Sequence, residues 1–260
     1  MNPMTEQRSP SRQVAVTGAN RGIGRAIASR FLREGWEVWG LVRAPQSLKL
    51  ESTGNGILHP VAFDAADERS VLEAAARLSR EAPALKVLVN NAGISLSAPL
   101  AKTASADLAR MMAINFTAPF LLCQQLMPAM AKAGGGRVVN IASTAALKGF
   151  RYTSGYCASK HALLGMTRAL ALEFAAKNVT VNAVCPGWTD TDMLSASVDN
   201  IVKASGRKTD EAREALQKMN PQGRFVTPDE VADVVWFLAA AEGARAVTGA
   251  AYLVDGGETL

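Results

Sequence analysis

The chain of 260 residues is predicted to form an α/β fold built on one doubly wound parallel sheet. Short apolar runs of strand length alternate with longer segments of helical periodicity, with no internal repeat and no linker between them. Apolar residues make up 48% of the chain, which is enough for one large core. We expect residues 1–12, which are polar and contain two prolines, to be a flexible tail, and residues 13–260 to be a single domain.

Composition narrows the classes of function. The formal net charge is +5, but no run of five basic residues occurs, so we expect an anionic small molecule rather than a nucleic acid as partner. The three cysteines lack the spacing of metal ligands, which argues against a metal site or disulfides and suits a reducing cytoplasm. The most apolar segment, 111–131, contains Asn, Gln and Pro, so we expect it in the core or a subunit interface and not in a membrane.

The first strand, Val14–Val16, leads directly into a glycine-rich turn and then a helix that ends near Gly35. In this context the glycines predict a dinucleotide site, because they let a pyrophosphate approach the helix N-terminus. Their spacing is GxxxGxG, which predicts a longer turn than the usual GxGxxG motif. The cofactor-binding candidates in the turn are Gly18, Asn20, Arg21, Gly22, Ile23 and Gly24.

The next two strands carry the residues that would choose the nucleotide. The strand 38–42 ends in Arg43, which suits a 2′-phosphate, and Arg21 could reach the same phosphate. Either arginine alone could be a solvated surface charge, but together they favour NADP(H) over NAD. The third strand is expected at Val61–Asp64, where Asp64 could accept a hydrogen bond from an adenine amino group or act as a turn or cap residue. We expect Leu72, Ala75, Ala76 and Leu78 to form the buried face of the helix that follows.

The central candidates are Ser143, Tyr156 and Lys160. Ser143 follows the short strand Arg137–Ile141, and Tyr156 and Lys160 are four apart on one helix face. Lowering the pKa of a tyrosine from about 10 to about 7 requires about 4 kcal/mol, and an ammonium at about 4 Å supplies that at an effective dielectric constant of about 20. We therefore expect Lys160 to tune Tyr156 as a general acid-base, with Ser143 donating to a carbonyl oxygen. A surface tyrosine with a solvated lysine is the alternative, and the position of Ser143 argues against it.

Three further segments complete the expected site. The strand 87–89 ends in Asn-Asn-Ala-Gly, where small residues allow a ligand to lie against the backbone. In the helix 111–131, Asn115 is either a structural polar anchor or the holder of an ordered water. The strand Val179–Val184 is closed by Cys-Pro-Gly, and residues 188–225 read as a mobile lid of short amphipathic pieces. A helix at 228–241 and a strand at 251–254 end the sheet.

Taken together, these motifs resemble the short-chain dehydrogenase/reductase family from Val14 to Gly257. The likeness rests on TGANRGIG at 17–24, NNAG at 90–93, Asn115, Ser143, YCASK at 156–160, the Pro-Gly pair at 186–187 and VDGG at 254–257. The resemblance implies a Rossmann-type sheet of seven strands, nicotinamide hydride transfer and a homotetramer.

The resemblance also implies roles for the site residues. Tyr156 would protonate the substrate oxygen, and Lys160 would lower the tyrosine pKa and hold the nicotinamide ribose. Ser143 would polarise the carbonyl, and Asn115 would hold a water in a proton relay. The remaining implied cofactor contacts are Asp64, Ala65, Asn91, Ala92, Gly93, Pro186, Gly187, Thr189 and Thr191. Trp188, bulkier than the Phe or Tyr expected there, would shape the substrate pocket.

Within the family the chain is similar to 3-oxoacyl-thioester reductases and aromatic polyketide ketoreductases, on the strength of VNAVCPGWTDTDM at 181–193 and the charged lid. The leading hypothesis is an NADPH-dependent reduction of a 3-oxoacyl thioester, on CoA or a carrier protein, or of a related β-keto compound. The alternative is a secondary-alcohol, sugar or cyclic-alcohol dehydrogenase that works oxidatively. A non-catalytic nucleotide-binding scaffold is a third class, against which the intact Asn115, Ser143, Tyr156 and Lys160 argue.

Overall fold

A computed structural model describes residues 12–50 and 54–260, so the tail predicted at 1–12 lies almost entirely outside the described residues. Seven parallel strands form one sheet in the order β3-β2-β1-β4-β5-β6-β7. The strands are β1 (Gln13–Thr17), β2 (Glu37–Val42), β3 (Ile57–Ala62), β4 (Leu85–Asn90), β5 (Gly136–Ile141), β6 (Val179–Pro186) and β7 (Ala251–Val254). The doubly wound parallel sheet is thereby confirmed. Its strand order reverses between β1 and β4, the place where such sheets bind ligands.

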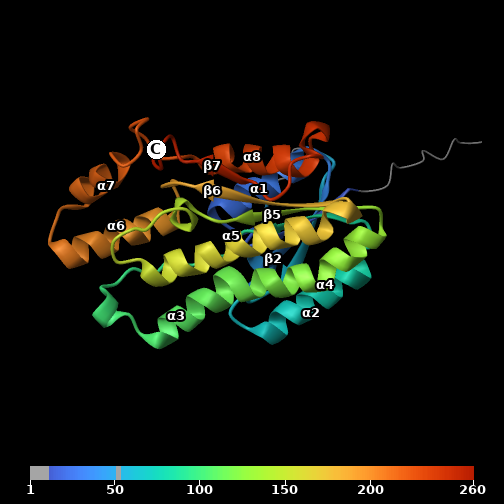
Figure 1. The fold of residues 1–260 in the computed structure, drawn as a ribbon, viewed down its shortest axis with the longest axis horizontal. Coiled ribbons are helices and arrows are strands. Elements are labelled where there is room, and N and C mark those ends of the chain that lie inside the picture. Colours follow the sequence, from blue (N-terminus) through green and yellow to red (C-terminus); the bar gives the residue numbers. More distant parts are fainter. Residues whose placement is uncertain (1–11, 51–53) are drawn as a thin grey trace, which may run out of the picture.

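Helices cover both faces of the sheet (Figure 1). They are α1 (Gly22–Arg33), α2 (Glu68–Glu81), α3 (Ser105–Met112), α4 (Ala118–Lys132), α5 (Ser154–Phe174), α6 (Asp192–Ser205), α7 (Thr209–Gln217) and α8 (Pro228–Ala240). Short 3₁₀ turns lie at Pro45–Ser47, Leu100–Lys102, Thr144–Ala146, Ala175–Lys177 and Glu242–Ala244. The core has two layers: α1 and α8 pack on one face of the sheet, and α2, α4 and α5 pack on the other.

The third strand begins earlier than predicted. β3 runs from Ile57 to Ala62 and contains Pro60 opposite Gly40 of β2, whereas the prediction placed the strand at 61–64. A proline lacks the N–H of a sheet ladder and is tolerated on an edge strand, which is where β3 lies. The helix after it was also partly misjudged. The buried face of α2 contains Val71, Ala74, Ala75 and Leu78, while Leu72 and Ala76 are exposed.

The long helix expected at 111–131 is part of a longer helical run. It begins with α3 at Ser105, passes through a π-helical turn at Ala113–Thr117 and continues as α4 to Lys132. The extra residue of a π turn changes which side chains face inward, and here Ile114 and Asn115 are buried. No helix within residues 12–50 and 54–260 is long and apolar enough to cross a membrane.

The segment predicted as a lid contains α6 and α7, which extend to one side of the sheet in Figure 1. Both helices are amphipathic, as predicted, and they bury a small cluster of their own with Leu194, Val198, Ala212, Leu216 and Phe225. The base of the segment is closed by a bridge between Thr189 and Val226. Its mobility stays a prediction.

Candidate active site

The floor of the site is a hydrogen-bonded junction between the ends of β1 and β4. The Thr17 hydroxyl accepts from the backbone N–H groups of Asn91 and Ala92, at 2.9 Å each. The Asn91 side chain donates to the Thr17 carbonyl at 2.8 Å. The two central loops are therefore tied to each other by buried or half-buried bonds. An Asn directly after β4 therefore joins the two neighbouring loops, and Thr17 is a residue that the sequence analysis missed, although it opens the glycine motif.

The glycines of the turn are required by close approaches. A Cβ on Gly24 would overlap the carbonyl oxygen of Gly18, and Gly18 itself has a φ of 68°. A Cβ on Gly22 would lie 3.1 Å from the methyl carbon of Thr191. The glycine turn and the segment after β6, both predicted as cofactor contacts, thus meet in the structure.

The N-terminus of α1 has no side-chain cap. Its N-cap residue, Arg21, has an extended backbone and makes no side-chain capping bond, and the first turn contains no acidic residue. The unpaired N–H groups and the positive end of the helix dipole favour an anion at this position. Asn20 is exposed beside it, and Ile23 is half-buried in the first turn.

The residues predicted to select the nucleotide lie toward the outer strands. Arg43 is exposed just after β2, and Asp64 and Ala65 are half-buried after β3. The carboxylate of Asp64 accepts from the N–H of Ala66 at 2.9 Å, so the turn role that we left open for Asp64 is present. Arg21 forms an ion pair with Asp192, the first residue of α6, at 3.3 Å. The side chains of Arg21 and Asp192 are both well exposed, so their ion pair contributes little to the free energy of unfolding. Arg21 can therefore exchange Asp192 for another anionic partner.

Asn115 is a structural anchor in this structure. Its oxygen accepts from the N–H of Ile94, and its amide donates to the carbonyl of Ile94 and to the Ser159 hydroxyl, each at 2.9 Å. The side chain is fully buried, and it holds the loop after β4 against α5. The anchor alternative is therefore confirmed. The proton relay stays a prediction, and Ser159 was missed although it lies inside the YCASK motif.

Ser143, Tyr156 and Lys160 are brought together at the end of β5. Ser143 caps the turn Thr144–Ala146 through a bond from the Ala145 N–H at 3.1 Å, and its side chain hydrogen-bonds the Tyr156 hydroxyl. The Lys160 ammonium lies 5.8 Å from the centre of the Tyr156 ring and donates to the Ile141 carbonyl at 2.8 Å. It also lies against Gly93, where an added Cβ would approach it to 3.5 Å.

The expected direction of the tyrosine pKa was wrong. Burial raises the pKa of Tyr156 to about 12, although its hydrogen bond with Ser143 acts in the opposite direction. Burial also lowers the pKa of Lys160 to about 8. The cost of removing each charge from water exceeds the attraction that we had assigned to the pair. Tyr156 is accordingly a protonated donor at neutral pH.

The segment after β6 folds over the edge of the site. Pro186 is the last residue of β6, and the Thr189 hydroxyl donates to the Gly187 carbonyl at 3.0 Å. The Thr191 hydroxyl donates to the Thr189 carbonyl at 3.3 Å. Trp188 is half-buried and packs against the apolar cluster of α6 and α7, so it joins the predicted pocket to the lid.

Comparison with known proteins agrees with this arrangement. A family model described as enoyl-(acyl carrier protein) reductase matches residues 18–259. The chain is 35% identical over 249 residues to D-threitol dehydrogenase of Mycolicibacterium smegmatis, covering 94% of this chain and 92% of that protein. It is 33% identical over 246 residues to 3-oxoacyl-[acyl-carrier-protein] reductase of Thermotoga maritima, covering 93% and 95%. A solved structure of an actinorhodin polyketide ketoreductase variant with NADPH has a TM-score of 0.88 at 35% identity, covering 95% and 97%.

The family model and the relatives show an oxidoreductase family that acts on an alcohol or its ketone, and the parallel sheet of this chain presents Ser143, Tyr156 and Lys160 at its carboxyl edge. The chain belongs to the short-chain dehydrogenase/reductase family, as the sequence motifs predicted.

Proposed function

We propose that this protein is an NADP(H)-dependent reductase that converts a ketone to a secondary alcohol. The observation that carries the proposal is the convergence of three groups at the carboxyl end of β5: the Tyr156 hydroxyl, its partner Ser143, and the buried Lys160 ammonium. A protonated tyrosine beside a second hydroxyl donor is suited to a carbonyl oxygen that gains negative charge.

The residues present fit a dinucleotide. The glycine turn allows backbone approach at Gly24, α1 offers an uncapped N-terminus, and Asn91 ties the two central loops. We propose that the glycine turn holds the pyrophosphate, that Arg43 and Arg21 take the 2′-phosphate, and that Asp64 and Ala65 lie near the adenine. The segments Asn91–Gly93 and Pro186–Thr191 line the remainder, and NADP(H) fits the two arginines better than NAD does.

The chain's own residues then have separate tasks. Ser143 and Tyr156 donate hydrogen bonds to the substrate oxygen, and Tyr156 delivers the proton to it. When bound, the nicotinamide supplies the hydride. Lys160, charged below about pH 8, holds the ribose side of the site and stabilises negative charge on Tyr156 after the proton has left. Asn115 keeps the loop after β4 at its distance from α5.

For the substrate we propose a 3-oxoacyl thioester, on CoA or a carrier protein, or a related β-keto compound. The likeness to the Thermotoga maritima reductase and to the polyketide ketoreductase supports it. Oxidation of a polyol is the second candidate, since the D-threitol dehydrogenase is as similar in sequence.

The test is a substrate panel. Loss of NADPH absorbance is followed with acetoacetyl-CoA, a cyclic ketone and a simple methyl ketone, and gain of absorbance is followed with NADP⁺ and a polyol. We expect kcat/KM to be highest for the β-keto thioester. Higher kcat/KM with the polyol would favour the second candidate. Binding of NADPH without turnover of any compound would favour the non-catalytic nucleotide-binding scaffold. The Tyr156→Phe protein, purified identically, controls for a contaminating reductase.

We also propose that the protein is a cytoplasmic homotetramer. Phe237 of α8 and Leu253 of β7 are exposed on one edge of the sheet, and Leu172 of α5 is 84% exposed. Such exposed apolar side chains on regular elements favour contacts between copies of the chain. Light scattering coupled to size exclusion should give four times the chain mass of 27.4 kDa. A monomeric mass would contradict the assembly.

A further inference from the structure

Glu258, the third residue from the end of the given sequence, places a buried carboxylate between two loops of the site. The residue is only 6% exposed. One carboxylate oxygen accepts from the Thr144 hydroxyl at 3.1 Å, and the other accepts from the backbone N–H of Trp188 at 3.3 Å. These partners lie 114 and 70 residues away in the sequence. A buried carboxylate is costly unless such bonds offset its desolvation.

The two partners belong to the parts of the site with different tasks. Thr144 directly follows Ser143 and begins the 3₁₀ turn that Ser143 caps. Trp188 directly follows the Pro-Gly pair and packs on the cluster of α6 and α7. Its carbonyl accepts from the N–H of Val226 at 2.9 Å, at the base of the lid. Glu258 thus bridges the loop that bears the catalytic hydroxyl and the loop that starts the lid.

The neighbouring residues hold the Glu258 carboxylate in place. A Cβ on Gly187 would lie 2.6 Å from a Glu258 carboxylate oxygen and 3.1 Å from the Asp255 Cα, so a side chain at this position would displace the Glu258 carboxylate. The Lys148 ammonium donates to the backbone carbonyl of Glu258. Asp255 accepts from the N–H groups of Gly257 and Thr259 at 3.0 Å each, which fixes the turn that presents Glu258.

We infer that Glu258 is a positioning residue that sets the separation between the Ser143 loop and the Trp188 wall of the substrate pocket. This inference rests on the proposed function. In it Glu258 touches neither substrate nor cofactor. Its bonds to Thr144 and Trp188 fix the distance between the Ser143 loop and the start of the lid, so the residue acts on ketone turnover more than on nucleotide binding.

The experiment compares four variants in kcat, KM for the ketone and Kd for NADPH. Glu258→Ala removes both bonds and leaves two buried donors without partners, and we expect kcat/KM for the ketone to fall about 10- to 100-fold. Kd for NADPH should change less than kcat/KM does, because Glu258 bonds to only one residue, Trp188, of the cofactor segment Pro186–Thr191 and makes no bond to the glycine turn. Glu258→Gln should restore most of the activity, since its carbonyl can accept from Trp188 and its amide can donate to the Thr144 oxygen.

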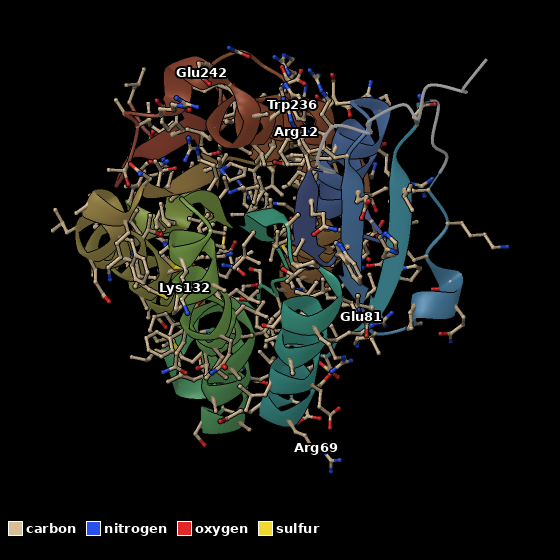
Figure 2. The ribbon with its side chains drawn as sticks, turned by 90° about the vertical axis from the view of Figure 1, so that its right-hand side faces the viewer. Arg12, Arg69, Glu81, Lys132, Trp236 and Glu242 are labelled. Atoms are coloured by element: carbon tan, nitrogen blue, oxygen red, sulfur yellow. The ribbon has the colours of Figure 1, made fainter. Side chains whose placement is uncertain are left out.

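Two matched controls separate positioning from general loosening. Thr259→Ala removes a bond of 2.7 Å to Asp255 in the same tail without touching Thr144 or Trp188. Glu242→Ala removes an exposed glutamate that pairs with Arg245 and that Figure 2 labels in the last, red part of the chain. We expect both to keep activity near that of the unaltered protein.

Hydrogen exchange provides a readout that does not depend on activity. Glu258→Ala should speed exchange in the peptides covering 143–148 and 187–194, and Glu258→Gln should not. Unchanged exchange in either peptide would overturn the inference, as would an equal loss of activity in Glu258→Ala and Thr259→Ala. If the unaltered protein reduces no ketone, the proposed function fails, and the exchange data still decide whether Glu258 links the two loops.

Discussion

The floor of the site and its lid are held together by different kinds of contact. In the floor, bonds between Thr17 and Asn91 join the ends of β1 and β4, and Asn115 holds the loop after β4 to α5 through Ile94 and Ser159. The lid, residues 188–225, buries a small cluster of its own, and its contacts with the rest include the Thr189–Val226 bridge, the Trp188–Glu258 bond and the exposed Arg21–Asp192 ion pair.

This difference indicates that the floor and the lid have separate tasks. Groups that must lie within a fraction of an ångström of the reacting atoms are placed on a scaffold that opens only with the whole fold. A segment that admits substrate can have a small core, because local opening then costs less free energy than global unfolding. The predictions that follow test whether this contrast holds, beginning with the largest effect.

Tyr156→Phe tests the chemistry of the floor. We expect kcat to fall by about 10²–10⁴, the range typical of losing a general acid, because Tyr156 is the proposed source of the proton. Kd for NADPH should stay within a few-fold, since the ring remains. Tyr152→Phe, an exposed tyrosine four residues earlier, is the control. More than about a tenth of the activity remaining in Tyr156→Phe would assign the proton to another group.

Leu88→Ala and Leu194→Ala compare the two regions directly. Both leucines are almost completely buried, Leu88 in β4 and Leu194 in α6. Leu88→Ala should lower the global free energy of unfolding by about 2–5 kcal/mol, the cost of a buried cavity. Leu194→Ala should instead speed hydrogen exchange in α6 and α7, with a smaller global change.

Exchange in the lid of the unaltered protein belongs to the same experiment. We expect 195–219 to exchange faster than β4 without ligand and to slow when substrate is bound. Exchange in the lid as slow as in β4, or equal global losses for the two variants, would remove the contrast between floor and lid.

Arg43→Asp tests the outer edge of the floor. A charge-assisted hydrogen bond contributes about 1.5–3 kcal/mol, so the unaltered protein should prefer NADPH over NADH by about 10- to 100-fold in kcat/KM. The aspartate would repel the 2′-phosphate and accept from the ribose hydroxyls, which reverses the preference.

Two conditions sharpen the test of Arg43. The preference should weaken as salt rises, because Arg43 and Arg21 are exposed. Arg69→Asp is the control, since Arg69 lies on α2 at the surface and pairs with Glu73 (Figure 2). Equal use of both nucleotides by the unaltered protein would make Arg43 an ordinary surface charge.

Lys160→Ala tests the electrostatics at the floor. Burial lowers the pKa of Lys160 to about 8, so the side chain is charged below that pH and neutral above it. The rate of ketone reduction should therefore fall as pH rises through about 8, and the variant should lose this inflection together with about tenfold in rate. Nucleotide binding should weaken as well. Lys132→Ala, an exposed lysine at the end of α4, should keep the profile (Figure 2). An unchanged inflection in Lys160→Ala would assign it to another group.

The site residues that could be predicted from the sequence are those whose pattern spans only a few neighbouring positions. The glycines of the first turn and the four-residue spacing of Tyr156 and Lys160 are readable because a strand, a turn and one helix face each span few residues. The early start of β3 was missed because Pro60 is excluded only from central strands, and edge position is a property of the whole sheet. The buried face of α2 was misplaced by one residue, because the side of a helix that faces the core is set by the elements packed against it, here the sheet and α4.

By itself, the sequence determined the order of strands and helices, the loops that bear the site and the residue types able to move a proton. Periodicity and turn chemistry act over a few residues, so they survive without tertiary contacts. Only the tertiary structure decided the raised pKa of Tyr156, the anchoring of Asn115 and the bridge from Glu258 to Thr144 and Trp188. Each depends on burial or on partners distant in sequence, and the desolvation that governs a buried charge exists only once the chain is packed.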